Sequence, residues 1–207
     1  MAKKEAPIES LAAYLPEGTY PMVAQYLHQY KIHLTITKAR ASILGDYRHA
    51  VHGKNHRISV NGNLNVHAFL LTLLHEIAHL LTFQVHGNRV QSHGREWKNE
   101  FARLLKYFLE AGIFPADIAQ AVRKSLHSPA ASSCADDELT RVLSRYDKNA
   151  DGIVLVEDLS PGEHFIIKGG RVFRKGNTLR KRVQCLEVKT GREYLFSPVY
   201  EVKKFNV

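Results

Sequence analysis

Apolar positions along the chain recur mostly at helical spacing, and the longest such stretch predicts a buried helix. From residue 65 onward, apolar side chains occupy almost every face of that helix: Val66, Phe69, Leu70, Leu73, Leu74, Ile77, Ala78 and Leu81. Asn63 or Asn65 can cap its start, and Gly87 can end it. A helix that is apolar all round belongs in the interior of a folded unit.

Shorter segments predict the elements around this helix. Helical spacing predicts further helices at 21–30, 92–110, 115–126 and 137–146. Alternation of apolar and polar residues predicts strands at 32–36, 47–49 and 57–60. After residue 162 the pattern changes to β-rich segments at 165–167, 171–174, 181–189 and 192–202, separated by Gly169-Gly170, Gly176-Asn177 and Thr190-Gly191. These segments predict a small antiparallel β unit.

Length and composition describe a globular protein with a small appendage. The chain has 207 residues, of which 44% are hydrophobic and 24% charged. Its two cysteines exclude a disulfide framework and a four-cysteine zinc site. No apolar segment follows the N-terminal lysines, and the apolar run at 68–81 is short and has a polar centre. We therefore expect a soluble, cytoplasmic protein that does not span a membrane.

Charge divides the chain further. The net charge is +9, but residues 127–165 carry net −5 and residues 166–207 carry net +8. A basic block can contact nucleic acid, or it can keep a small β unit soluble. Within it, Arg180, Lys181 and Arg182 are the candidate nucleic-acid contacts. The expected domains are 1–126, an acidic linker with a short helix at 127–160, and a basic β-rich unit at 161–207.

Three ionisable side chains interrupt the buried helix and point to metal chemistry. His75-Glu76-Ile77-Ala78-His79 is an H-E-x-x-H motif, and residues four apart lie on one helix face, so both imidazoles can reach one Zn²⁺. Glu76 is turned about 100° away, where it can accept a proton from a zinc-bound water. Unpaired polar groups would be costly in an apolar helix, which favours a metal site over a core helix with satisfied histidines.

A catalytic zinc needs a third protein ligand, and spacing alone leaves several candidates. The metzincin pattern fails because Thr82 and Val85 stand where it requires glycine and histidine. His86, His93, Glu96 and Glu100 all remain available.

The two motif blocks resemble the SprT-like family, which includes the Spartan proteases. The resemblance lies in residues 71–79, Leu-Thr-Leu-Leu-His-Glu-Ile-Ala-His, and in residues 92–97, Ser-His-Gly-Arg-Glu-Trp, and it extends over roughly 20–112. It implies His75, His79 and His93 as ligands of one Zn²⁺ per chain, with Glu76 as general base. It also implies a protein or peptide substrate and, in Spartan-type members, cleavage of proteins crosslinked to DNA.

The resemblance completes the expected fold. We expect an α+β protein with a zincin-like helical core, in which the H-E-x-x-H helix packs on a small antiparallel sheet. The C-terminal β unit is similar in cadence to the zinc ribbon of bacterial relatives, but only Cys185 could match a ligand there.

Two further features have weaker signals. Asp147 to Asp158 opens like an EF-hand calcium loop, but Asp158 replaces the usual glutamate and Pro161 interrupts the exit helix. Tyr47, Arg48, His49, His52 and His56 are candidates for lining the cleft, without an assigned role.

The sequence thus predicts a zinc-dependent endopeptidase that acts through Glu76, with DNA-associated proteins as candidate substrates. One rival is a nucleic-acid-binding module with a structural zinc closed by a fourth protein ligand such as Glu100 or His86. The other is a zinc hydrolase of small substrates, for example an amidase.

Overall fold

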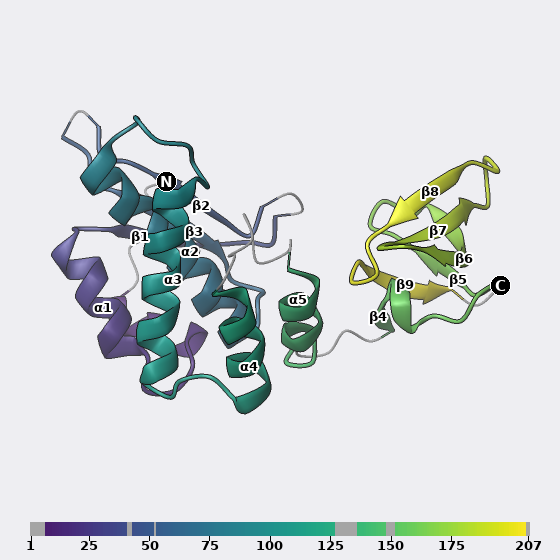
Figure 1. Ribbon diagram of the computed structural model, residues 1–207, viewed down its shortest axis with the longest axis horizontal. Helices are drawn as coiled ribbons and strands as arrows, with labels where there is room; N and C mark the ends of the chain where they lie inside the picture. The colour runs from purple at the N-terminus through teal and green to yellow at the C-terminus, as the bar shows by residue number, and fades with distance from the viewer. Residues whose placement is uncertain (1–6, 41–42, 52, 127–135, 148–151, 206–207) are drawn as a thin grey trace. The chain divides into compact units, whose positions relative to one another are not determined.

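The computed structural model describes residues 7–40, 43–51, 53–126, 136–147 and 152–205 (Figure 1). The chain forms two compact units, Met1–Tyr146 and Asp147–Val207. Helices and sheets are both present, so the predicted α+β class is confirmed.

The first unit packs its helices and a small sheet around one central helix. Its described elements are, in chain order, η1 (Ile8–Tyr14), α1 (Tyr20–Gln29), β1 (His33–Thr37), β2 (Gly45–Arg48), β3 (Arg57–Asn61), α2 (Val66–His86), α3 (Arg95–Glu110), α4 (Ala116–Ser125) and α5 (Asp137–Ser144). The predicted helices and strands of this part are therefore present, with ends displaced by at most three residues.

Helix α2 is the centre of the first unit. Asn65 caps it as predicted, because its side-chain oxygen accepts hydrogen bonds from the backbone N–H groups of His67 at 3.1 Å and Ala68 at 2.9 Å. Gly87 ends it with a φ of 58°. The helix contacts η1, β2, β3 and α3. It is therefore covered on more than one side, and most of its side chains are buried.

The sheet of the first unit is mixed, so the prediction of an antiparallel sheet was wrong in part. Its strand order is β1-β3-β2, with β1 parallel and β2 antiparallel to β3. Strand β3 lies in the middle because its Ile58 and Val60 are fully buried. The chain reverses direction twice between β1 and β3, which leaves these two strands parallel. An alternating pattern reveals a strand but not its neighbour.

The boundary between the units lies elsewhere than expected. Helix α5 packs on α4, and its Leu139, Val142 and Leu143 join the core of the first unit. Tyr146 donates a hydrogen bond to Asp117 at 2.7 Å. The segment 127–160 is therefore shared between the two units rather than standing apart, and residues 127–135 lie outside the described residues.

The second unit is an antiparallel sheet with a core of its own. Its elements are β4 (Ile153–Leu155), η3 (Val156–Asp158), β5 (His164–Ile166), β6 (Val172–Leu179), β7 (Arg182–Glu187), β8 (Glu193–Phe196) and β9 (Glu201–Phe205), in the sheet order β4-β9-β5-β6-β7-β8. The core includes Val156, Phe165, Phe173, Val183 and Cys185. Cys185 is fully buried, and no metal-ligand cluster surrounds it among the described residues.

Gly176-Asn177 does not end a strand, which corrects the expected break there. Strand β6 continues to Leu179, with a shift in its pairing to β7 between Lys175 and Thr178. A Cβ on Gly176 would lie 2.9 Å from the carbonyl oxygen of Gln184, so the glycine permits a close backbone approach at this bulge.

Two alternative roles for segments of the fold can be judged from these elements. Helix α2 is long and apolar enough to cross a membrane, a test that core helices also pass, and 67% of its most apolar window is buried. In the EF-hand-like segment, β4 and η3 form the second half of the loop, and a turn at 161–162 follows where the exit helix would continue. Asp158 accepts a hydrogen bond from the Leu155 backbone. Residues 148–151 of that loop lie outside the described residues.

Candidate metal centre

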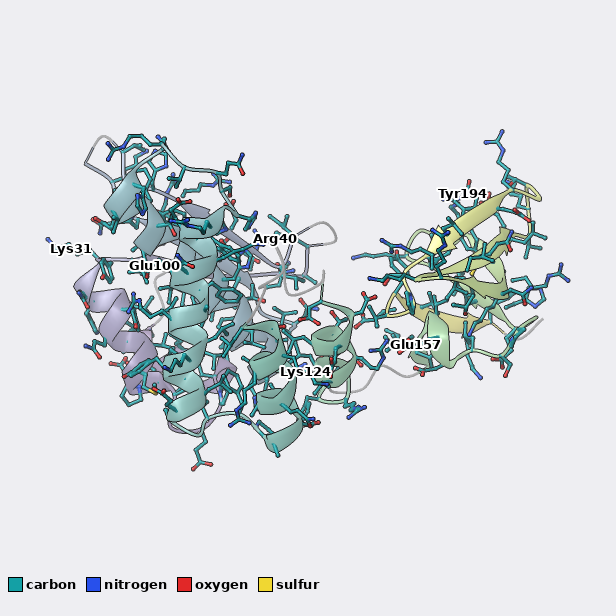
Figure 2. The ribbon with its side chains drawn as sticks, in the orientation of Figure 1. Lys31, Arg40, Glu100, Lys124, Glu157 and Tyr194 are labelled. Atoms are coloured by element: carbon teal, nitrogen blue, oxygen red, sulfur yellow. The ribbon has the colours of Figure 1, made fainter. Side chains whose placement is uncertain are left out.

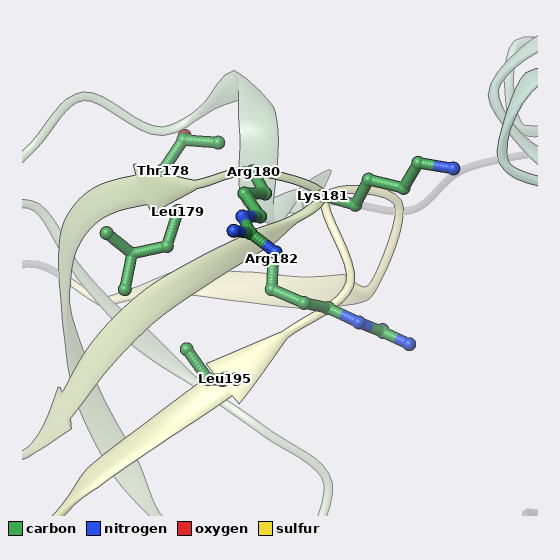
Figure 3. Close-up of a pocket in the computed structure, with 6 residues that line it drawn as sticks. All are labelled: Thr178, Leu179, Arg180, Lys181, Arg182 and Leu195. Atoms are coloured by element: carbon green, nitrogen blue, oxygen red, sulfur yellow. The ribbon is translucent and has the colours of Figure 1, made fainter.

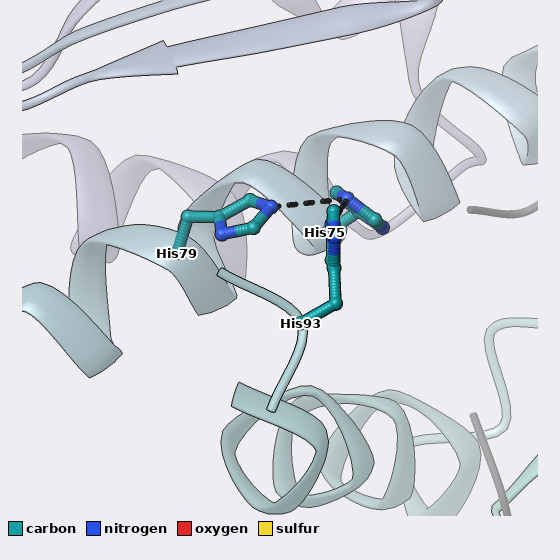
Figure 4. Close-up of side chains that lie close together, drawn as sticks. All are labelled: His75, His79 and His93. Atoms are coloured by element: carbon teal, nitrogen blue, oxygen red, sulfur yellow. Dashed lines mark hydrogen bonds between the residues drawn. The ribbon is translucent and has the colours of Figure 1, made fainter. Parts of the chain in front are cut away.

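Three histidines from two parts of the first unit meet at one point. His75 and His79 lie on successive turns of α2, and His93 lies just before Gly94, the residue that caps α3. The Nε2 atom of His75 is 3.2 Å from Nε2 of His79 and 3.2 Å from Nε2 of His93 (Figure 4). The sequence thus placed two of these residues by spacing, and the return of the chain to α3 brings the third.

The spacing of the nitrogens fits a metal ion. A tetrahedral zinc with Zn–N bonds of about 2.0–2.1 Å holds its ligand nitrogens about 3.3–3.4 Å apart. The two measured separations lie close to this value, and the ligand atoms of all three residues lie within 4.8 Å of one another. The cluster can therefore hold a metal ion with little rearrangement.

The protonation state of the histidines suits ligation. Burial lowers the pKa of His75 to about 3, with the neighbouring His79 and His93 adding to the effect. Burial, and then His93, lowers the pKa of His79 to about 4, and burial also lowers the pKa of His93. The imidazoles are therefore neutral near pH 7, and each offers a free lone pair.

The side chain of Trp97 packs against all three histidines. The indole of Trp97, on the first turn of α3, lies 4.7 Å from the rings of His75 and His93 and 5.3 Å from that of His79, measured between centroids. Trp97 is fully buried, and its Nε1 has no hydrogen-bond partner within the described part of the chain. Since this is the one tryptophan of the chain, its fluorescence can report on the cluster.

Glu76 follows His75 on α2, and its side chain packs against Gly45 of β2. It is only 6% exposed. Burial and, to a lesser extent, the neighbouring Asp46 raise the pKa of Glu76 to about 8, although Arg40 opposes the shift. A bound cation would favour the ionised carboxylate and so reverse this shift. The buried acid is thus poised to change protonation state near neutral pH.

Strand β2 contributes an aromatic side chain that packs against His79. The ring of Tyr47 stacks parallel to that of His79, at 6.5 Å between centroids. The hydroxyl of Tyr47 lies 2.9 Å from Nδ1 of His56, which also accepts a hydrogen bond from the backbone N–H of Ala50. Because Nδ1 of His56 accepts from Ala50, the Tyr47 hydroxyl donates to it, and burial also lowers the pKa of His56. Burial raises the pKa of Tyr47.

Among the described residues, the others suggested for the cleft are not seen in contact with the three histidines. His49 stacks on Phe83 at 4.5 Å rather than on a ligand. Arg48 is exposed and paired with Asp46 at 2.8 Å. His52 lies outside the described residues.

The alternative third ligands do not join the cluster. In the described part of the chain, no metal-ligating group other than the three histidines lies within ligand distance of them. Glu100 is paired instead with Arg103 at 2.7 Å. Glu96 and His86, at the start of α3 and the end of α2, are likewise outside the cluster. The described residues therefore offer three ligand atoms to a metal ion at this point and no fourth.

Sequence reasoning missed the polar clamp that holds the start of β2. Asn61, 1% exposed, donates to the carbonyl of Ile43 at 3.0 Å and accepts from Arg40 Nε at 2.8 Å. Arg40, labelled in Figure 2, also contacts the carbonyl of Leu44 at 3.3 Å. The available signal was Gly45, because a glycine inside a strand often marks a close approach of another element.

The basic residues Arg180, Lys181 and Arg182 lie in the second unit. Arg180 and Lys181 form the turn between β6 and β7, where Arg180 has a φ of 52°, and Arg182 opens β7. Together with Thr178, Leu179 and Leu195 they line an open hollow of about 830 Å³ (Figure 3). None of the three cations has a carboxylate partner among the described residues, whereas Arg171 and Lys204 are paired with Glu187 and Glu163.

The comparison with known families agrees with this geometry. The SprT-like family, a group of metallopeptidase-like proteins, matches residues 22–115, a range that contains α2, the three histidines and all of α3. No curated protein and no solved structure matches the chain. The resemblance inferred from the two motif blocks is confirmed, and residues 22–115 form an SprT-like region.

Proposed function

We propose that the protein is a zinc-dependent endopeptidase with a zincin-like catalytic core. The observation that carries the proposal is the convergence of three neutral histidines, beside a buried glutamate on the same helix, with no fourth protein ligand among the described residues. A structural zinc has four protein ligands, whereas a catalytic zinc has three and an open position. This difference favours a peptidase over a binding module with a closed zinc.

The chain's own residues have separate roles in this reaction. His75, His79 and His93 would hold the ion, which when bound activates water and polarises the substrate carbonyl. The Glu76 carboxylate takes up the proton released as water attacks the peptide carbon. It then passes that proton to the leaving amine. The buried position of Glu76 keeps bulk water from supplying the proton instead.

The Glu76→Gln variant tests this proposal. The amide keeps the size of the side chain but cannot accept a proton, so zinc content should stay at one per chain. Turnover of an unfolded protein substrate should fall by about 10²–10⁴-fold, the usual contribution of a general base. Elemental analysis and cleavage assays measure the two quantities on the same preparation.

His93→Ala and Trp97 fluorescence complete the test. His93→Ala should lower zinc affinity strongly, which titration with Co²⁺ against the Trp97 emission can quantify. Wild-type turnover in Glu76→Gln would refute the peptidase mechanism. Full zinc affinity in His93→Ala would refute the three-histidine site. Activity only on small amides would support the rival hydrolase.

We further propose that the tip of the β6–β7 hairpin contacts nucleic acid, which would bring the peptidase to DNA-associated proteins. Around the hollow lie three cations without a carboxylate partner among the described residues, and they support this role. Replacing Arg180, Lys181 and Arg182 by alanine should weaken binding to a single-stranded oligonucleotide. It should also reduce the slope of log K against log salt by about 0.7 per lost phosphate contact.

A charge-matched control separates local contact from net charge. Lys31, Lys54 and Lys106 are exposed residues of the first unit, and replacing them by alanine removes the same charge. This control should keep the wild-type salt slope. Equal weakening in both triple variants would contradict a specific contact at the hairpin tip.

A further inference from the structure

The backbone of β2 lies directly against the side chain of Glu76 at Gly45. A Cβ built on Gly45 would lie 2.5 Å from Oε1 of Glu76, 2.9 Å from Cγ of Glu76 and 2.8 Å from Cγ2 of Thr72. All three distances are below those that real Cβ atoms show, so any side chain at position 45 must displace its neighbours. The space that a side chain at position 45 would occupy is thus filled in part by the side chain of Glu76.

The requirement for glycine at this position is one of space. The φ of Gly45 lies outside the left-handed region, so alanine can adopt the same backbone conformation. Glu76 and Thr72 belong to a buried face of α2, one turn apart, and Thr72 is held by a hydrogen bond from its hydroxyl to the carbonyl of Ala68. The helix is therefore less free to yield than the carboxylate of Glu76.

The strand is equally constrained from the other side. Asn61 donates its backbone N–H to the carbonyl of Leu44 at 2.9 Å, and its side-chain amide holds the carbonyl of Ile43. Thr37 and Arg40 both donate to the side-chain oxygen of Asn61, at 3.0 and 2.8 Å. This clamp fixes the two residues that precede Gly45. A methyl group at position 45 would therefore push Glu76 rather than lift β2.

We propose that Gly45 is a positioning residue: the bare backbone of β2, clamped by Asn61, holds the Glu76 carboxylate in the place from which it acts. The inference rests on the proposed function, in which Glu76 carries the proton. A misplacement of a reacting group by about 1 Å can cost about 100-fold in rate. In Gly45→Ala, kcat should fall tenfold or more, while KM and zinc content remain those of the wild type.

A double-variant cycle tests the contact without any measurement of activity. Gly45→Ala should lower the melting temperature of the zinc-loaded, full-length chain by several degrees. In a Glu76→Ala background, which removes Cγ and Oε1, the same substitution should cost less than half as much. Gly62→Ala is the matched control, because its Cβ would meet Cγ2 of Ile36 at 2.7 Å instead of Glu76. Its cost should be the same in both backgrounds, and its kcat should remain that of the wild type.

The outcomes separate the two hypotheses. Coupling between positions 45 and 76, together with a loss of kcat at unchanged KM, supports the inference. Equal costs of Gly45→Ala in both backgrounds overturn it, and so does coupling without any loss of kcat. A wild-type protein that cleaves nothing would instead refute the proposed function, and that result is seen before any variant is made.

Discussion

At the scale of single residues, the site combines two buried groups whose pKa values shift in opposite directions. Burial favours the neutral form of both, so the pKa of Glu76 rises to about 8 while that of His75 falls to about 3. Without metal, the site therefore contains a protonated acid beside neutral bases. A cation that binds the histidines would favour ionisation of the neighbouring acid.

The metal-free protein should show a pH dependence that reveals Glu76. Its pKa is raised in the folded state, so the folded state holds more protons than the unfolded state between about pH 4.5 and 8. This group therefore lowers stability as pH rises through that window. His75 and His79 act in the opposite sense, because their lowered pKa values make stability fall as pH drops from about 6.5 towards 4.

Comparison with Glu76→Gln isolates the effect of the glutamate. In chelator-treated protein, urea unfolding at pH 5 and pH 8 should show the variant gaining stability relative to wild type as pH rises. Parallel pH profiles of the two proteins would contradict a raised pKa for Glu76. Proton release from the wild type, but not from the variant, when zinc is added at pH 7 would support it independently.

At the scale of elements, the N-cap residue Asn65 both begins α2 and links it to α5. The Asn65 side chain caps two backbone N–H groups and also donates to the carbonyl of Leu143 at 3.0 Å. Replacing it with alanine should lower the free energy of unfolding by about 1 kcal/mol, within the range of about 0.5–2 for lost N-caps. Urea unfolding measures this loss.

Asn65→Asp separates the two contributions. The aspartate keeps the oxygen that accepts from His67 and Ala68 but loses the donor to Leu143. Its stability should lie between those of wild type and Asn65→Ala. The zinc stoichiometry should be unchanged in both variants, since the ligands begin ten residues later. Loss of zinc from Asn65→Asp would show that the cap also orders the metal centre.

At the scale of the whole molecule, each unit has a core of its own. The cluster around α2 and the cluster around Phe165 and Phe173 share no residue. We therefore expect residues 1–146 alone to fold, bind one zinc and cleave an unfolded substrate with the kcat of the full chain. Circular dichroism, elemental analysis and a cleavage assay check these three properties. A fragment 1–146 that unfolds would show that the β unit stabilises the first unit.

The β unit should matter for location rather than for chemistry. Removing it should leave cleavage of free substrate unchanged but reduce cleavage of a substrate bound to single-stranded DNA. Equal rates on both substrates in the full chain would leave the basic hairpin tip without a role in recruitment.

Local patterns in the sequence predicted many elements of the fold and part of the site. The period of the apolar residues predicted α2, and Asn65 and Gly87 marked its ends, because capping depends on residues within one turn. His75 and His79 were predicted as partners for the same reason, since helical geometry alone places residues four apart on one face. For His93, spacing left several alternatives open, and the family resemblance selected it.

The remaining features depend on contacts between segments far apart in the chain, which no local pattern contains. The parallel pairing of β1 with β3 follows from the path of the chain through β2, and the bulge at Gly176 follows from the approach of β7. The contact of Gly45 with Glu76 joins residues 31 positions apart, and the Asn61 clamp that holds it joins two strands and their loop. The sequence by itself determined which residues could bind a metal and on which helix. Only tertiary packing decided that His93 completes the cluster, that β2 contacts Glu76 and that burial favours the neutral forms of the histidines and of Glu76. These features depend on contacts and burial, which arise only when segments distant in the chain pack together.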